Sequence, residues 1–138
     1  MKRKEARVQI LSLLFETGFR KDETPAEIYA RAVEMRELED DDYIRDSYFG
    51  VMDNLEFTDK KIAAFSHGWK TERISPVSRA IMRLAIYEMY FRDDVPDNVA
   101  VNEAVELVKV YDDEDKVKAF VNGILNSVLQ EKKSGGAE

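Results

Sequence analysis

The chain has 138 residues, of which 36% are charged, and 21 basic against 28 acidic side chains give a net charge of −7. This length fits one domain that buries a real core without covalent staples. Because there is no cysteine and only one histidine, disulfides, thiolate catalysis and multi-histidine or cysteine-ligated metal sites are excluded. No run of 18 apolar residues occurs and Glu5 argues against a signal peptide, so we expect a cytoplasmic protein that does not enter a membrane.

Helical periodicity and capping signals predict four helices in the first half of the chain. An apolar run at residues 8–15 predicts a largely buried first helix that stops near Gly18. Thr24-Pro25, followed by a glutamate at the third helical position, is typical of a capping box that opens the second helix. The third helix is expected over about 41–55, and Thr58 is expected to cap a short fourth helix.

Three more helices are predicted in the second half. Ser75-Pro76 repeats the cap-then-proline signal, Asn98 is a candidate cap for the next helix, and Asp112 or Asp113 for the last. Seven helices with short loops and no strand pattern predict an all-α fold. We expect one compact domain over residues 1–133, with helical subdomains of about 1–70 and 71–133, and a disordered tail at 134–138.

The basic residues are concentrated at the N-terminus. Lys2, Arg3, Lys4 and Arg7 lie beside a single acid, Glu5, so this segment has a side-chain charge of +3 in an acidic protein. On a helix, Arg7 shares a side with Arg3 and Lys4. Cations at a helix N-terminus oppose the macrodipole by ~0.3–1 kcal/mol each, which suggests an anionic partner such as a phosphate backbone. A frayed, solvated terminus is the alternative.

Three longer strings carry a resemblance. They are RAIMRLAIYEM at 79–89, VNEAVELVK at 101–109 and FVNGIL at 120–125. With Ala6-Arg7 after the basic run, they make the chain similar to the NusB family of bacterial transcription antitermination factors over residues 2–130. The resemblance implies two packed helical subdomains and no catalytic site or cofactor. It also implies binding of boxA-type single-stranded RNA with the small-subunit ribosomal protein NusE. That complex joins elongating RNA polymerase and other Nus factors, notably on ribosomal RNA operons.

Carried over position by position, the resemblance implies these RNA-binding residues: Lys2, Arg3, Lys4, Arg7, Phe15, Lys118, Phe120 and Asn122. Phe120 is assigned to base stacking and Asn122 to a base-edge or phosphate hydrogen bond, whereas Phe15 could stack on a base or pack in the core. Gly123 within a helix costs ~1 kcal/mol relative to alanine. Close approach of another helix, or of the RNA backbone, would explain this glycine.

Three acidic residues are candidates for contact with the ribosomal partner: Glu88, Asp113 and Asp115. Glu88 could instead pair with Arg83 or Arg92. Asp113 and Asp115 lie in a loop that carries one residue more than the family pattern. Asn102 and Glu103 are interpreted as helix-start residues. Trp69 is interpreted as a residue that packs in the core or between subdomains, with an exposed partner contact as the alternative.

A second function remains open from the sequence. The net charge of −7 and the glutamate within the basic run also fit a helical protein-interaction module. Its main partner would be a second copy of the chain or a ribosome-biogenesis protein, with incidental RNA contact. Salt dependence separates the two hypotheses, because phosphate contacts weaken with salt and apolar association depends on it little.

Overall fold

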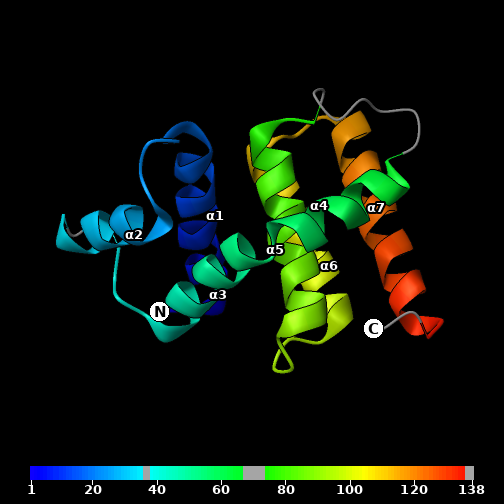
Figure 1. Cartoon of the computed structure of the whole chain (residues 1–138). Coiled ribbons are helices and arrows are strands. Elements are labelled where there is room, and N and C mark those ends of the chain that lie inside the picture. Colours follow the sequence, from blue (N-terminus) through cyan, green and yellow to red (C-terminus); the bar gives the residue numbers. More distant parts are fainter. Residues whose placement is uncertain (36–37, 67–73, 136–138) are drawn as a thin grey trace.

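The computed structural model describes residues 1–35, 38–66 and 74–135. These residues form seven helices and no strand, which confirms the all-α fold class (Figure 1). The helices are α1 (Arg3–Phe19), α2 (Pro25–Glu34), α3 (Asp42–Asp53), α4 (Leu55–Phe65), α5 (Pro76–Phe91), α6 (Asp97–Tyr111) and α7 (Asp115–Lys133). Within these ranges, no helix combines the length and the apolar character needed to cross a membrane.

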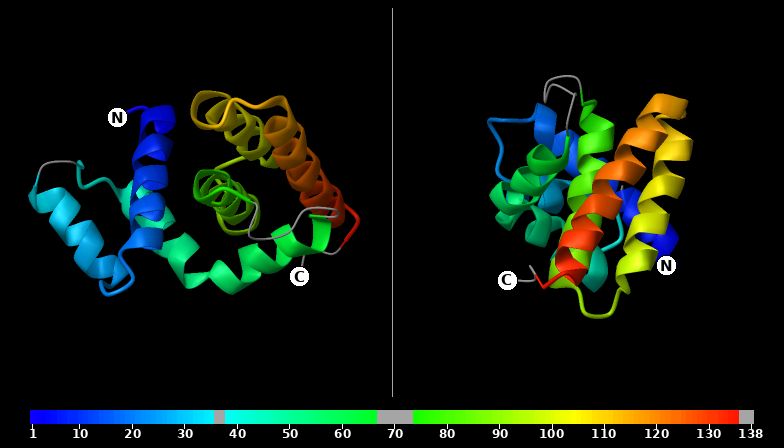
Figure 2. Two further views of the ribbon diagram at one scale, coloured as in Figure 1. Left: turned by 90° about the horizontal axis from the view of Figure 1, so that it is seen from above. Right: turned by 90° about the vertical axis from the view of Figure 1, so that its right-hand side faces the viewer.

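Helix α5 is the central element of the fold. It packs against α1, α3 and α4 on one side and against α6 and α7 on the other. Seen from above, α5 is surrounded by these helices, with α1 across from α6 and α7 (Figure 2). Ten of its sixteen residues are buried, because helices pack against it on more than one side.

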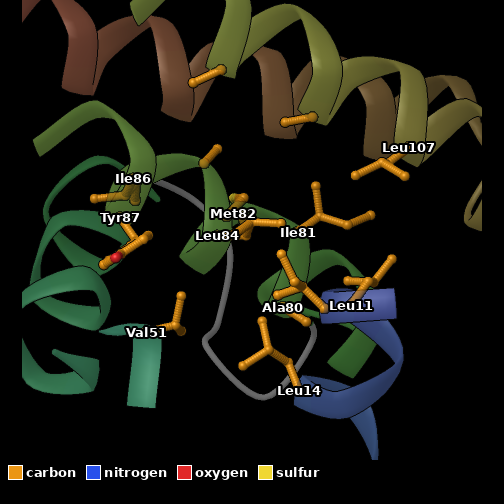
Figure 3. Close-up of a cluster of buried hydrophobic side chains, with 14 of the residues drawn as sticks. Leu11, Leu14, Val51, Ala80, Ile81, Met82, Leu84, Ile86, Tyr87 and Leu107 are labelled. Carbon is orange, nitrogen blue, oxygen red and sulfur yellow. The ribbon is translucent and has the colours of Figure 1, made fainter. Parts of the chain in front are cut away.

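The core is built from α5 side chains that interlock with both neighbouring groups of helices (Figure 3). Ile81, Met82 and Leu84 of α5 are at most 2% exposed. Leu14 of α1 lies on one side of them and Leu107 of α6 on the other. Burying each such side chain stabilises the fold by ~1.5–3 kcal/mol.

Two helix starts follow the sequence prediction. The Thr24 hydroxyl accepts a hydrogen bond from the Glu27 amide (3.1 Å), and the Glu27 carboxylate accepts one from the Thr24 amide (2.8 Å). This is the predicted capping box. The Ser75 hydroxyl likewise accepts a hydrogen bond from the amide of Ser78 (3.0 Å) at the start of α5.

Three predicted caps are wrong. Thr58 is buried one turn inside α4 and donates to the Leu55 carbonyl (3.1 Å). Helix α6 begins at Asp97, one residue before Asn98, so Asn102 and Glu103 lie within the helix and not at its start as interpreted. Helix α7 begins at Asp115. Asp112 instead accepts hydrogen bonds from the Ser75 and Ser78 hydroxyls (2.9 Å each), which ties the loop before α7 to the start of α5. Trp69 lies outside the described residues.

A buried charge network joins four helices. The Arg7 guanidinium of α1 donates to both oxygens of Glu88 of α5 (3.1 and 3.3 Å), and these residues are 5% and 1% exposed. The hydroxyl of Tyr43 in α3 donates to the same carboxylate. Glu103 of α6 lies 3.9 Å from the Arg7 guanidinium. Charged side chains are rarely this buried unless they are paired, so the network holds α1, α3, α5 and α6 in one arrangement.

This network corrects the expected partner of Glu88. Arg83 instead donates to Asp59 (2.8 and 2.9 Å), and Arg92 to Asp94 (3.0 and 2.8 Å). The sequence could not rank these arginines against Arg7, because Arg7 is 81 positions from Glu88 and only the packing of α1 on α5 brings them together.

We expect Arg7→Ala to lower the free energy of unfolding by ~3–5 kcal/mol, because it leaves the Glu88 carboxylate buried and unpaired. Urea denaturation of both proteins measures this difference. Arg20→Ala is the matched control, since Arg20 forms an exposed pair with Glu16 and should cost at most ~1 kcal/mol. Equal losses in the two variants would contradict a structural role for Arg7.

We expect Gly50→Ala in α3 to destabilise the protein by ~1–3 kcal/mol through overpacking. A Cβ at Gly50 would lie 2.3–2.6 Å from the ring and hydroxyl of Tyr87. That ring is buried and stacked on Phe91 (5.7 Å between centroids), so it has little room to move. Gly18→Ala in α1 is the control, because nothing lies within 4 Å of its added Cβ and it should not destabilise. A rise in melting temperature with Gly50→Ala would contradict this packing.

Candidate nucleic-acid interface

The first turn of α1 presents two exposed cations toward the α5–α6 side of the molecule. The Arg3 guanidinium lies 3.9 Å from the centre of the Tyr43 ring and 3.6 Å from the Asp94 carboxylate. The Lys4 ammonium lies 3.5 Å from Glu103 and the Lys4 side chain is 68% exposed. Lys2 is also exposed, and its backbone amide donates to Glu5 (3.1 Å), which satisfies an amide at the helix start. Arg3 and Lys4 therefore each have a carboxylate of the same chain beside them.

Arg7 does not belong to this exposed set. Its guanidinium lies between Glu88 and Glu103 inside the buried network. A side chain that is 5% exposed and fully paired does not present a surface to RNA phosphate. Glu88, at 1% exposed, likewise presents no surface to a protein partner. The structure thus corrects both expectations and gives Arg7 and Glu88 the role of positioning α1 on α5.

Sequence reasoning missed the group that surrounds Arg3. Arg92 donates two hydrogen bonds to Asp94, and its guanidinium lies 5.0 Å from the centre of the Tyr43 ring. The hydrogen bond from Arg92 holds the pKa of Asp94 below its usual range, so Asp94 is charged at neutral pH. Burial, reinforced by the charge of Glu88, raises the pKa of Tyr43. No local pattern could have revealed this group, because its members come from α1, α3 and the α5–α6 loop.

An apolar pocket of about 190 Å³ lies farther along α1. It is lined by Val8, Leu11, Ser12, Phe15, Val77 and Tyr111. Phe15 is 39% exposed and packs edge-to-face on Phe19, with 4.8 Å between ring centroids. Tyr111, at the end of α6, is 47% exposed. The structure therefore places Phe15 on the surface, where its ring can contact a ligand, and not in the core.

The α7 candidates form a second group. The Lys118 ammonium lies 2.8 Å from Asp113 and 3.3 Å from Asp115, and the hydrogen bond with Asp113 raises the pKa of Lys118. Phe120 is partly buried against the core and lines a second pocket, of about 180 Å³. The exposed amide oxygen of Asn122 accepts a hydrogen bond from Asn126 (2.9 Å).

Gly123 is exposed on α7, next to Asn122. A Cβ added there would meet nothing within 4 Å, so the expected close approach of another helix is wrong. The glycine leaves the backbone of this turn accessible from outside the protein.

The fold arranges these residues along one path. Helices α1 and α6 flank α5 (Figure 2). Lys4 meets the middle of α6 at Glu103, and Phe15 shares its pocket with Tyr111 at the end of α6. Tyr111 immediately precedes the loop that leads to Lys118. Cations, exposed rings and an exposed amide suit a flat, anionic ligand such as a nucleic-acid strand. Among the described residues, no three His, Asp or Glu side chains converge as a metal site.

Known proteins resemble this chain over nearly its whole length. A family model described as the NusB family matches residues 4–130. The transcription antitermination protein NusB of Acetivibrio thermocellus is 44% identical, over 96% of this chain and 91% of that protein. The protein of the same name from Desulforudis audaxviator is 41% identical, over 95% of each.

Solved structures share the fold. NusB of T. maritima superimposes with a TM-score of 0.82 at 31% identity, covering 95% of this chain and 92% of that one. A chain in the crystal structure of antitermination factors NusB and NusE in complex with double-stranded RNA gives a TM-score of 0.77 at 27% identity, over 93% and 96% of the two chains. The sequence match over residues 4–130 and the shared helical arrangement together establish that this chain belongs to the NusB family.

Proposed function

We propose that this protein is a transcription antitermination factor that binds boxA-type single-stranded RNA together with NusE. It then joins the elongating RNA polymerase complex with other Nus factors, notably on ribosomal RNA operons, and acts in the bacterial cytoplasm. The observation that carries the proposal is the family match over residues 4–130, combined with a path of exposed cations and rings along α1. A relative in the family has been solved with NusE and RNA. The function is binding, not catalysis.

The proposed contacts differ in the kind of interaction that they offer to RNA. Lys2, Arg3, Lys4 and Lys118 supply positive charge for phosphates, which contribute affinity without reading sequence. Phe15 and Phe120 offer rings for base stacking, worth ~1–3 kcal/mol per base. Asn122 offers an amide to a base edge or a phosphate. Arg7 acts indirectly, because it fixes the helix that carries the N-terminal cations.

Asp113 and Asp115 remain the proposed contacts for NusE. Their side chains are 66% and 101% exposed, so both are available to a protein partner in addition to Lys118. In this proposal the NusE contact lies next to Lys118, at the α7 end of the RNA path.

A second function is favoured by one surface feature. Phe19, Val110 and Tyr111 are 64%, 71% and 47% exposed, and Tyr111 lines the apolar pocket. Exposed apolar side chains near a pocket also suit a protein partner, including a second copy of the chain. In that case the protein would be a helical interaction module and its RNA contacts would be incidental.

Fluorescence anisotropy with a labelled boxA RNA, with and without NusE, distinguishes the two functions. For the antitermination factor we expect binding that exceeds that of a scrambled RNA and increases with NusE. Three or four phosphate contacts predict a log–log salt slope of roughly −2 to −3. Equal binding of both RNAs with NusE present would support the interaction module, and light scattering across a salt series would then test for a homodimer.

Replacing Arg3 and Lys4 together by alanine should weaken boxA binding by about tenfold and flatten the salt slope by ~1.4, because two phosphate contacts are lost. The melting temperature should hardly change, since exposed pairs contribute only ~0–1 kcal/mol. Arg20→Ala with Lys60→Ala is the matched control, because it removes one exposed arginine and one exposed lysine elsewhere. The same loss of binding in the control would exclude the α1 cations as the RNA contacts.

The substitution Gly123→Ala tests whether this glycine is needed for RNA binding or for folding. Alanine should raise the free energy of unfolding by ~0.5–1 kcal/mol, because it favours the helix and meets no neighbour. If RNA approaches the backbone at this turn, boxA affinity should fall severalfold although the protein becomes more stable. Gly18→Ala has equally free space for its Cβ and should stabilise α1 without affecting RNA. Unchanged affinity in Gly123→Ala would place this turn outside the interface.

A further inference from the structure

The two exposed cations of α1 are each held by a carboxylate of the same chain. Arg3 lies 3.6 Å from Asp94, and Lys4 lies 3.5 Å from Glu103. The Arg3 and Lys4 side chains are 42% and 68% exposed, so both pairs are in contact with solvent. Solvent-exposed pairs contribute little to folding, which leaves their arrangement unexplained by stability.

Each carboxylate also has a more buried arginine nearby, which is hydrogen-bonded to Asp94 but only an electrostatic neighbour of Glu103. Arg92, with an 18% exposed side chain, makes two hydrogen bonds to Asp94. Arg7, at 5% exposed, lies 3.9 Å from Glu103. Each carboxylate therefore has an inner arginine and an outer cation. If the outer cation moves away, the carboxylate keeps a positive neighbour and is not left unpaired.

The outer cations are the members that can change partner. The Lys4 ammonium is on a flexible four-carbon chain and its distance to Glu103 exceeds a normal hydrogen bond. The Arg3 guanidinium is held against the Tyr43 ring, and its 3.6 Å separation from Asp94 is also too long for a hydrogen bond. An approaching phosphate can make shorter, charge-assisted hydrogen bonds to both cations.

From these contacts we propose that Asp94 and Glu103 act as built-in competitors of RNA phosphates. Their carboxylates neutralise Arg3 and Lys4 in the free protein, and RNA phosphates replace them as partners in the complex. The two carboxylates thereby lower the affinity of RNA binding. This inference rests on the proposed function, because it assumes that RNA contacts the first turn of α1.

Competition lowers the affinity for every RNA without changing the preference among sequences. The carboxylates oppose every phosphate that approaches Arg3 and Lys4, whatever the base sequence. They therefore lower non-specific binding to nucleic acid by the same factor as binding to boxA. Preference among sequences must then come from the stacking and amide contacts, which the carboxylates do not affect.

The test uses the full chain with Asp94→Asn, Glu103→Gln and both together, and a labelled boxA RNA in a salt series. Each change should tighten binding by about threefold, the size of one nearby charge in water, and the pair by about tenfold. The log–log salt slope should change by less than ~0.7, because Arg3 and Lys4 contact phosphates in both the wild-type and the variant complexes. Melting temperatures confirm that each variant folds.

Two controls decide whether the effect is local. Glu56→Gln removes one charge from an 84% exposed glutamate that pairs with Lys60 on α4, so it reproduces the change in net charge alone. In an Arg3→Ala background, Asp94→Asn should lose most of its gain, since the cation that it frees is absent. A gain no larger than that of Glu56→Gln, or one that persists without Arg3, would overturn the inference.

The same experiment tests the proposed function by a separate measurement. Wild-type preference for boxA over a scrambled RNA tests the function, whereas the ratio of variant to wild-type affinity tests the inference. That ratio should be the same for both RNAs. If the preference is absent but the ratio holds, the carboxylates compete with phosphate on a protein that reads no boxA sequence.

Discussion

The buried ion pair between Arg7 and Glu88 determines where the rest of the interface lies. It joins α1 to the central helix α5, and the Tyr43 hydroxyl adds α3 to the same carboxylate. Such a pair tolerates little rearrangement, because a displaced partner would leave a charge in the core without compensation. Helix α1 is consequently fixed in both position and rotation about its axis. The cations one turn earlier, Arg3 and Lys4, are directed by this constraint toward the α5–α6 loop and α6.

The first two turns of α1 thus combine two kinds of basic residue. Arg7 faces inward and is paired, whereas Arg3 and Lys4 face outward and remain partly exposed. Their separation by three or four positions places them on one side of α1 at different depths. Burial therefore divides a basic segment that looks uniform in sequence into a structural residue and candidate ligands for phosphate. Glu103 contacts both kinds and links the buried network to the surface.

An acidic protein can bind RNA when its charge is organised locally. The exposed cations of α1 and Lys118 of α7 are each paired with carboxylates of the chain, so the free interface carries little excess charge. In such an interface, affinity comes from exchanging one anion for another and from stacking on rings such as Phe15. Net charge describes long-range attraction, but it does not describe this local exchange.

The sequence by itself determined the helices and the family. Apolar spacing and the caps at Thr24 and Ser75 predict the all-α fold, and the strings at 79–89, 101–109 and 120–125 indicate the NusB family, because both are local features. Only the tertiary structure decided that Arg7 pairs with Glu88, that Gly123 meets no neighbour and that Asp94 accompanies Arg3. These facts depend on which helix faces meet across the core. Contacts between residues about 80 positions apart leave no trace in local periodicity, so burial and pairing emerge only when the helices pack.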